Sequence, residues 1–420
     1  MAGRTVDGGA TETDRCAGIV VRVERYACGQ VGSEWTETAR LIGWLEVWQA
    51  ATAAVDHPFD EWTDWLVRDL DSDVGWRARG WTLETRYGHD VAAACEALRE
   101  TLHGLGAVEP ARWLHYGLCS SDVADGGLWL TARAVTAELE DLADVAITSL
   151  LRLESEQLEE QVVHRTHGQA AQVGFGGLRW SRHRQNLAAA TRSMKTSAVR
   201  LSLPAFNGPT GTGGVLTVSQ RRAIRAKLAG SEQGAGSAAA GQNVGRDDYV
   251  QWAQAVSRLA TACERFGRDV RLLAATGVDE VSEGRGPEYR GSSSMPHKHN
   301  PTRSERLCGL APVVRGLVAG YQEAAAECWD SHSLEHSSAE RVVLPQITEL
   351  TGFMLREVYE IADTLVIHPG EVAENVDVAP ADSFARRNEL VREGVDGQAA
   401  YEATRAELPE LPVNKLLGPF

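Results

Sequence analysis

The sequence predicts an all-α protein, and three features of its pattern favour this class. Apolar residues recur at helical spacing through long stretches of the chain. No convincing alternation of apolar and polar residues, which would indicate half-buried strands, occurs anywhere. The longest periodic stretch, 128–167, contains neither glycine nor proline. Helices of this length pack as bundles, and unusually long ones often belong to oligomers.

The N-terminal part of the chain is predicted to form a small helical domain, 19–118, after a disordered tail, 1–18. The tail is polar and lacks the apolar segment of a signal peptide. Ser33, followed by acidic residues, is a helix-start pattern in which the serine is the cap. Several tryptophans between Trp44 and Trp81 are expected to fill the core of this domain.

Long helices dominate the predicted central domain, which spans 119–366. Pro345 lies inside the long helix expected at Ala339–Leu365 and is expected to kink it. Short segments interrupted by prolines follow and predict a small C-terminal helical domain, 367–420. The long helices are expected at 128–167, Tyr249–Leu273 and Ala339–Leu365.

Composition narrows the class of function. The formal charge of −16 over 420 residues argues against nucleic acid as the main partner, because phosphate backbones need basic faces. No apolar run reaches the length of about 18 residues that indicates a membrane helix. The 7 cysteines form no metal-spaced pair and no dense framework, so reduced thiols in a cytoplasmic protein are expected. We expect no metal and no cofactor.

A polar segment at 286–301 is the strongest candidate for chemistry. Gly291, Pro296 and three consecutive serines, Ser292 among them, predict a loop. The helix-like sequence after Pro301 predicts that the loop leads directly into a helix. Loops held by rigid scaffolds are where functional residues collect.

Further polar segments lie far apart in sequence at the predicted helix ends. Taken alone, each has a structural explanation: His89-Asp90 as a helix cap, or His167 as a C-terminal cap of the long helix. The glycine-rich run 208–214 lacks the Gly-Lys-Ser/Thr of a phosphate-binding loop. The remaining segments are Arg25-Tyr26, 115–123, 165–169 and 336–341.

The string Gly-Ser-Ser-x-Met-Pro-x-Lys-x-Asn at 291–300 resembles the signature loop of the fumarase/aspartase superfamily. His297 and the downstream Arg-Ser-Glu-Arg at 303–306 are most similar to its adenylosuccinate lyase branch. The other segments resemble motifs of the same branch and follow its order, over about 25–405. This resemblance implies an all-α, three-domain fold and a homotetramer built on a shared helical bundle, with sites assembled from three subunits. It also implies elimination of an amine from an N-linked succinyl substrate, which releases fumarate.

The resemblance assigns the catalytic roles residue by residue. Ser292 is the implied base, activated by desolvation and nearby positive charge. His167 is the implied general acid for the departing nitrogen, oriented by Glu305, and His89 is a second candidate near that nitrogen. Lys298 and Asn300 are expected to stabilise the developing charge and to anchor a carboxylate.

The substrate-binding residues are implied in the same way. Arg25, Tyr26, Ser337 and Arg341 correspond to the residues that hold a nucleotide phosphate, and Ser120-Ser121 to hydroxyls that bind a carboxylate. The further positions implied on the substrate side are Asp90, Thr166, Gln242, Ser293, Met295 and Arg306.

Departures from the family pattern leave the substrate open. Cys119 replaces the usual threonine, and His332 stands where a phosphate-contacting arginine is usual. Gly88 replaces a residue that is often polar. The alternatives are an adenylosuccinate lyase, a paralogue that cleaves another succinyl adduct such as nitrosuccinate, a non-catalytic structural relative, or another lyase or cycloisomerase. A nucleophilic Cys119 has no partnering motif in its favour.

Overall fold

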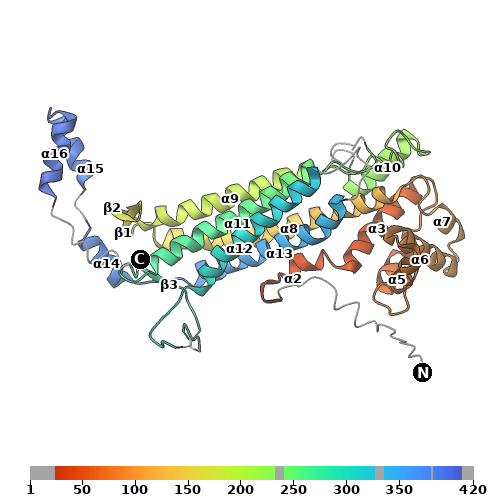
Figure 1. Cartoon of the computed structure of the whole chain (residues 1–420), viewed down its shortest axis with the longest axis horizontal. Coiled ribbons are helices and arrows are strands. Elements are labelled where there is room, and N and C mark those ends of the chain that lie inside the picture. Colours follow the sequence, from red (N-terminus) through yellow and green to blue (C-terminus); the bar gives the residue numbers. More distant parts are fainter. Residues whose placement is uncertain are drawn as a thin grey trace, which may run out of the picture. The chain divides into compact units, whose positions relative to one another are not determined.

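The computed structural model describes residues 24–231, 241–286, 288–292, 294–326, 335–379 and 382–408, so the predicted tail 1–18 lies outside them. Helices dominate these residues (Figure 1), which confirms the all-α prediction. The chain divides into two compact units, each assembled from segments far apart in sequence. Unit 1 comprises Met1–Thr131, Leu203–Arg246 and Gly320–Phe353, and unit 2 comprises Ala132–Ser202, Asp247–Ala319 and Met354–Phe420. The three-domain division from the sequence stays a prediction.

Unit 1 is built from short helices around a tryptophan-rich core. Trp44, Trp48 and Trp76 are each at most 2% exposed, which confirms their predicted core role. The indole N–H of Trp48 donates to Nδ1 of His115 at 3.0 Å, so this buried polar group has a hydrogen-bond partner. The helices of the unit are η1 (Glu24–Tyr26), α2 (Gly29–Ser33), α3 (Glu37–Ala53), η2 (Asp60–Trp62), α4 (Thr63–Asp69), α5 (Trp76–Tyr87), α6 (Asp90–Gly104), α7 (Val108–Trp113) and α10 (Val218–Ala229), together with the beginnings of α8 (Ser120–Glu156) and α13 (Glu335–Thr364) and the end of α12 (Thr302–Ala326).

The helix cap predicted at Ser33 was wrong. Thr36 caps α3, and its hydroxyl accepts the amide N–H of Ala39 at 3.1 Å. Ser33 ends the short helix α2 instead, and its hydroxyl donates to the carbonyl oxygen of Gln30 at 2.6 Å. Both residues offer a suitable oxygen, so the sequence pattern alone did not separate them.

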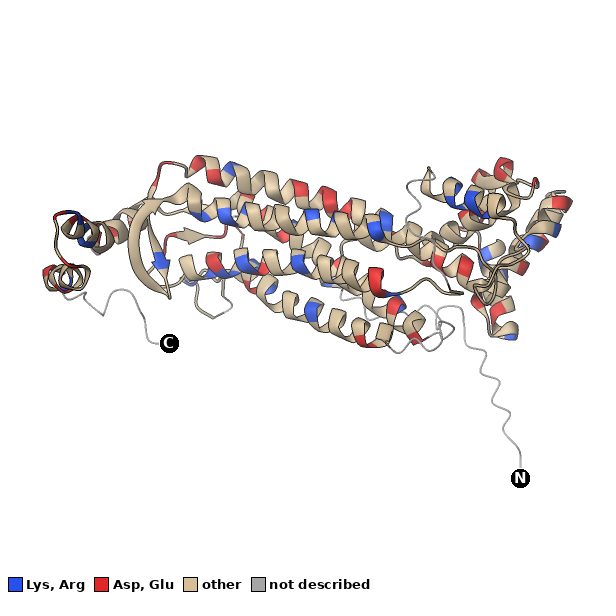
Figure 2. Ribbon diagram, turned by 90° about the horizontal axis from the view of Figure 1, so that it is seen from above, with Lys and Arg blue, Asp and Glu red and all other residues tan. Residues whose placement is uncertain are grey.

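Unit 2 contains a bundle of long helices that lie side by side (Figure 1). It consists of the rest of α8, α12 and α13 with α9 (Gly176–Arg200) and α11 (Asp247–Leu273). Acidic and basic residues are scattered along these helices (Figure 2), and several pair between neighbours. Arg184 of α9 bonds Glu154 of α8 at 2.6 Å, and Arg315 of α12 bonds Glu264 of α11 at 2.7 Å. These pairs fix which helices are neighbours.

Two predictions for this region were wrong. The long helix ends at Glu156, not at 167, and an antiparallel hairpin follows, made of β1 (Gln161–Thr166) and β2 (Gln169–Phe175). Its turn is His167-Gly168, and both residues have positive φ, 54° and 77°. This is the backbone of a tight hairpin turn, for which glycine is well suited. The sequence therefore does contain strands.

A second pair of strands joins the segment that follows α11 to the segment that follows α13. β3 (Val281–Ser282) pairs antiparallel with β4 (Val366–Ile367). The short C-terminal helices expected after 367 are confirmed as α14 (Pro369–Asp377), α15 (Ser383–Arg392) and α16 (Gly397–Glu407). Among the described helices, none is both long enough and apolar enough to cross a membrane.

Candidate active site

The loop from 283 to 301 connects β3 to α12 and carries several predicted catalytic residues. The hydroxyl oxygen of Ser292 accepts the amide N–H groups of Ser294 at 3.3 Å and Met295 at 3.0 Å. Hydrogen bonds to an oxygen favour its anionic form, so these amides lower the cost of ionising Ser292. Met295 is itself 46% exposed at the tip. Ser293, predicted to bind substrate, lies outside the described residues.

The two limbs of this loop touch near its tip. The side-chain amide of Asn300 donates to the carbonyl oxygen of Gly291 at 3.0 Å. A Cβ atom on Gly291 would lie only 2.3 Å from the carbonyl oxygen of Lys298, so a glycine is required there. The loop therefore places Gly291, which precedes Ser292, against the backbone of Lys298 and the side chain of Asn300.

Glu305 and Arg306 follow in the first turn of α12. Glu305 is exposed. Arg306 instead pairs with Glu357 of α13 at 2.9 Å. Burial raises the pKa of Glu357, although the charge of Arg306 opposes this. Arg306 thus has a partner within unit 2, which competes with its predicted substrate contact.

The hairpin presents Thr166 and His167 to solvent at its tip. It is anchored one residue earlier, where Arg165 donates to Glu280 at 2.8 Å. Glu280 is fully buried and also accepts from Arg179 at 2.8 Å. The described residues show no hydrogen bond between His167 and Glu305. The orienting role of Glu305 stays a prediction.

In unit 1, the predicted carboxylate-binding serines Ser120 and Ser121 open α8. The carboxylate of Asp122 accepts the backbone N–H of Cys119 at 2.9 Å. Burial raises the pKa of Asp122 to about 6. Burial, with the charge of Asp122, raises the pKa of the Cys119 thiol to about 12. A thiol so hard to ionise is a poor nucleophile, which argues against covalent chemistry at Cys119.

His89 and Asp90 lie at the start of α6 in unit 1. His89 caps this helix, and Nδ1 accepts the amide of Ala92 at 3.5 Å. Asp90 accepts from Arg341 of α13 at 2.6 Å and from Arg40 of α3 at 3.3 Å. Burial pushes the pKa of Asp90 upward, but the hydrogen bond and charge of Arg341, with the charge of Arg40, hold it below its usual value. The structure thus brings Asp90 and Arg341 together.

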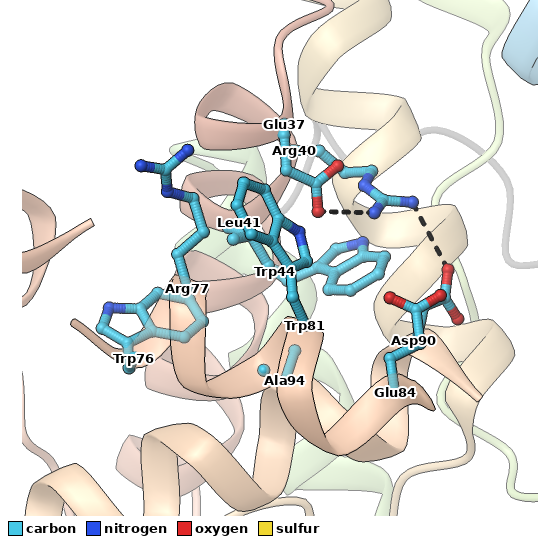
Figure 3. A pocket seen from close by; sticks show the side chains of 11 residues that line it. Glu37, Arg40, Leu41, Trp44, Trp76, Arg77, Trp81, Glu84, Asp90 and Ala94 are labelled. Atoms are coloured by element: carbon cyan, nitrogen blue, oxygen red, sulfur yellow. Dashed lines mark hydrogen bonds and ion pairs between the residues drawn. The ribbon is translucent and has the colours of Figure 1, made fainter. Parts of the chain in front are cut away.

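Arg40 is a charged residue of this cluster that the sequence did not single out. Its guanidinium lies 4.7 Å from the ring centre of Trp44 and bonds Glu37 at 2.6 Å. Figure 3 shows Arg40 between Glu37 and Asp90, at the edge of a recess also lined by Trp76 and Trp81. A lone arginine on a predicted helix gives no signal that it will meet a distant aspartate.

A buried charge network lies beneath the segment 336–341. Arg246 donates to Asp125 of α8 at 2.7 Å and to Glu340 of α13 at 2.6 Å. Asp125 also accepts the amide of Val244 at 2.8 Å. The network therefore holds the segment that contains Gln242 against the helices that carry Ser120 and Ser337. Sequence reasoning missed it, because the three charges are far apart in the chain.

The N-terminal pair Arg25-Tyr26 forms η1. The ring of Tyr26 meets Phe353 of α13 edge-on, with ring centres 5.3 Å apart, whereas Arg25 is exposed. His332, where the resemblance suggested a missing phosphate contact, lies outside the described residues. No group of three or more His, Cys, Asp or Glu side chains in the described part of the chain is placed to hold a metal ion.

The predicted site residues thus fall into two sets. Unit 2 carries the predicted catalytic residues Ser292, Lys298, Glu305 and His167, with the predicted substrate-side residues Thr166, Met295, Asn300 and Arg306. Unit 1 carries His89 and most of the residues expected to bind substrate: Arg25, Tyr26, Asp90, Ser120, Ser121, Gln242, Ser337 and Arg341.

Residues 26–316 match a family model described as "Lyase". The chain belongs to the fumarase/aspartase superfamily. An adenylosuccinate lyase from Synechocystis sp. is 29% identical over 398 residues, which cover 91% of this chain and 87% of that protein. An adenylosuccinate lyase from Methanothermobacter thermautotrophicus is 28% identical over 397 residues, covering 91% and 85%.

Solved structures support the superfamily fold. The chain is similar to the 3-carboxy-cis,cis-muconate lactonizing enzyme from Pseudomonas putida, with a TM-score of 0.74 and 24% identity over 91% of this chain and 85% of that chain. This likeness shows the fold alone. Together, these findings confirm the predicted superfamily, its helical fold and the lyase class.

Burial of Asp122 generates a prediction about stability and pH. Its folded pKa is raised above an unfolded value of about 3.9. The folded state therefore holds the proton between about pH 4 and 6, and stability falls as pH rises through that window. Asp122→Asn removes this dependence, so the variant should gain about 2–3 kcal/mol relative to wild type between pH 4 and 7. Urea unfolding at a series of pH values measures the difference.

The matched control is Asp141→Asn, which alters an exposed acid on the same helix. Its unfolding free energy should follow that of wild type at each pH. Parallel curves for Asp122→Asn and wild type across this window would show that Asp122 is not held protonated by burial.

Proposed function

We propose that this protein is a lyase that releases fumarate from an N-linked succinyl substrate by β-elimination, with adenylosuccinate, which gives AMP and fumarate, as the first candidate. Purine biosynthesis in the cytoplasm is the setting that this substrate implies. The observation that carries the proposal is the hydroxyl of Ser292, which accepts two backbone amides in the same loop as Lys298 and Asn300. Relatives that cover most of the chain and carry the name adenylosuccinate lyase support it.

The first step is removal of a proton from the carbon beside a substrate carboxylate. Ser292, ionised, takes this proton and becomes a neutral hydroxyl. The two amides that bond its oxygen stabilise the alkoxide before the transfer. The charge that develops on the carboxylate is met by the ammonium of Lys298 and the amide of Asn300, an electrostatic contribution of a few kcal/mol.

The second step breaks the carbon–nitrogen bond. His167, protonated, donates to the departing nitrogen, so the amine leaves neutral and fumarate keeps the new double bond. The hairpin turn that presents His167 is suited to this role because Arg165 and Glu280 anchor it just behind the tip. His89, at the start of α6, is the alternative donor.

Assembly is part of the proposal, because the chain carries its proton-transfer and anion-binding residues in different units. We propose that copies of the chain form a homotetramer in which different subunits complete each site. Apolar side chains exposed on the long helices of unit 2 support association. They are Val145 and Leu151 on α8, Leu178 and Val199 on α9, and Val313 on α12.

The leaving group is the finer question. Arg25, Tyr26, Ser337 and Arg341 favour a substrate with a phosphate, which needs several donors in fixed geometry. Cys119 favours the second candidate, a lyase for another substituted succinate such as nitrosuccinate. Its thiol is a weaker donor than the hydroxyl usual at this position.

Ser292→Ala should lower kcat by at least about 10²-fold, the usual scale for loss of a general base. Substrate binding should remain measurable, because the base acts in the chemical step. Fumarate release, followed by ultraviolet absorbance with adenylosuccinate and nitrosuccinate as substrates, provides the measurement. Ser294→Ala is the control, since only its backbone N–H contacts Ser292. A near-normal kcat in Ser292→Ala would assign the base elsewhere.

Light scattering should give the mass of four chains at working concentration, because the exposed apolar residues of unit 2 become buried between copies. Replacing Leu151 and Leu178 by serine should shift the mass toward smaller species. A stable single chain in the wild type would contradict both the tetramer and the shared site.

Arginine variants separate the two candidate substrates. If the substrate carries a phosphate, Arg341→Ala and Arg25→Ala should each lower kcat/KM by about 10–150-fold, the value of one charged hydrogen-bonding group. If the true substrate is a phosphate-free succinyl adduct, Arg25→Ala should leave kcat/KM for it nearly unchanged. Steady-state kinetics with both substrates provides the measurement. If kcat/KM for the phosphate-free substrate falls by about 10²-fold or more in both variants, the phosphate-free candidate is excluded.

A further inference from the structure

The N-terminus of α12, where the signature loop ends, is capped in an unusual way. The residue before the helix is Pro301, which has no side-chain acceptor for the unpaired N–H groups of the first turn. Two of those groups are satisfied by Glu283, which lies at the other end of the loop. Its carboxylate accepts the amide of Ser304 at 2.7 Å and that of Arg303 at 3.2 Å. Glu283 therefore occupies the place of a helix cap from outside the helix.

The same carboxylate makes two further contacts. It accepts the hydroxyl of Ser304 at 2.8 Å and pairs with Arg285. Glu283 is 9% exposed and Ser304 is fully buried. A carboxylate removed from water with several donors is held strongly, because any displacement leaves a charge unpaired.

Arg285 and Tyr289 extend this clamp toward the tip of the loop. Arg285 donates to the hydroxyl of Thr302 at 3.0 Å, and its guanidinium lies 4.6 Å from the ring centre of Tyr289. The phenol of Tyr289 in turn donates to the carbonyl oxygen of Asn300 at 3.3 Å. The first half of the loop is thus bonded to its second half at two places, Arg285 to Thr302 and Tyr289 to Asn300.

Gly284 fixes the base of the loop to the end of α13. A Cβ atom there would lie 1.9 Å from the carbonyl oxygen of Thr364, so no other residue fits without movement. The hydroxyl of Thr364 also approaches the carbonyl oxygen of Gly284 at 3.4 Å. The loop therefore has a base and neck held by packing and charge, while Met295 and Lys298 at its tip remain exposed.

We propose that Glu283 is a positioning residue, which acts through the loop neck to set the place of Ser292 and Lys298. This inference rests on the proposed function, in which these two residues act on the substrate. Glu283 touches no reacting atom. It also occupies the first-turn amides of α12, so this helix end is not available to bind a substrate carboxylate, and that task falls to Lys298 and Asn300.

Glu283→Gln is the direct test, because it keeps the shape of the side chain and replaces one acceptor oxygen by a donor. The new NH₂ group faces N–H donors, so at least one capping bond is lost. The matched control is Glu264→Gln. Glu264 is also buried in unit 2 and accepts from Arg268 and Arg315, each at 2.7 Å, but it lies on α11 outside the loop.

Two readouts follow the neck and the chemistry separately. Hydrogen exchange should become faster at the amides of Arg303 and Ser304 in Glu283→Gln and remain unchanged there in Glu264→Gln. The kcat of Glu283→Gln should fall by about 10–100-fold with little change in KM, since a displacement of about 1 Å can cost about 10²-fold. The primary kinetic isotope effect on substrate deuterated at the reacting carbon should increase, because proton removal becomes more rate-limiting.

The isotope effect distinguishes misplacement of the loop from a simple loss of folded enzyme. Loss of folded enzyme lowers the apparent kcat but leaves the isotope effect unchanged. Faster exchange with an unchanged isotope effect and kcat would overturn the proposal, and so would unchanged exchange at the amides of Arg303 and Ser304. If Glu283→Gln does not fold, Arg285→Gln tests the same neck, because it removes the charged partner of Glu283 and so loosens the cap without deleting its carboxylate. It should show smaller changes in the same direction, and their absence would equally overturn the proposal.

Failure of the proposed function would be visible independently. If the wild type releases fumarate from neither adenylosuccinate nor nitrosuccinate, that function fails in the wild type itself. The exchange measurement still decides whether Glu283 holds the neck, because it requires no turnover.

Discussion

The pairing of buried carboxylates with arginines is the interaction on which the arrangement of the candidate site depends. Glu280 is fully buried between Arg165 and Arg179, and Arg246 joins Glu340 to Asp125. An unpaired charge in these places would be costly, so each pair accepts only a narrow range of positions for the segments that carry it. The pairs thus convert a bundle of helices, which could slide, into a scaffold that fixes particular loops and helix ends.

These pairs lie just behind the residues that are expected to meet the substrate. Arg165 precedes Thr166 and His167, and Glu340 precedes Arg341. Glu283 plays the same part for the loop that holds Ser292. In each case, a residue that forms a structural ion pair lies close in sequence to a residue proposed for chemistry. Positioning of this kind is what elimination requires, because base, acid and anion-stabilising groups must all meet one substrate.

The environment of Cys119 bears on how this chain differs within its superfamily. Burial and the charge of Asp122 raise the pKa of its thiol, which is therefore a weak hydrogen-bond donor without charge. The anion-binding cluster around Arg341 has a different character, since Asp90 already neutralises part of it. A phosphate that binds Arg341 has to compete with that aspartate.

The sequence alone determined the helical class, the positions of most long helices and the loop that carries Ser292. These features depend on local patterns: helical spacing of apolar residues, and glycine, serine and proline in the loop. The motif strings also identified the superfamily, because their residues are consecutive in the chain. The C-terminal limit of α8 was not determined, since the apolar residues of 161–166 fit either a helix or a strand until the positive φ at His167 and Gly168 is known.

Only the tertiary structure decided which distant charges meet. Arg40 and Arg341 share Asp90, Arg246 bridges two acids, and Glu283 caps a helix that begins beyond the loop. Sequence spacing contains no information on such pairs, because burial selects a partner by position in space. Likewise, the residues proposed for proton transfer and those proposed to bind a phosphate lie in different compact units of the chain. Local sequence therefore set the chemical groups, and the packing of remote segments set their partners.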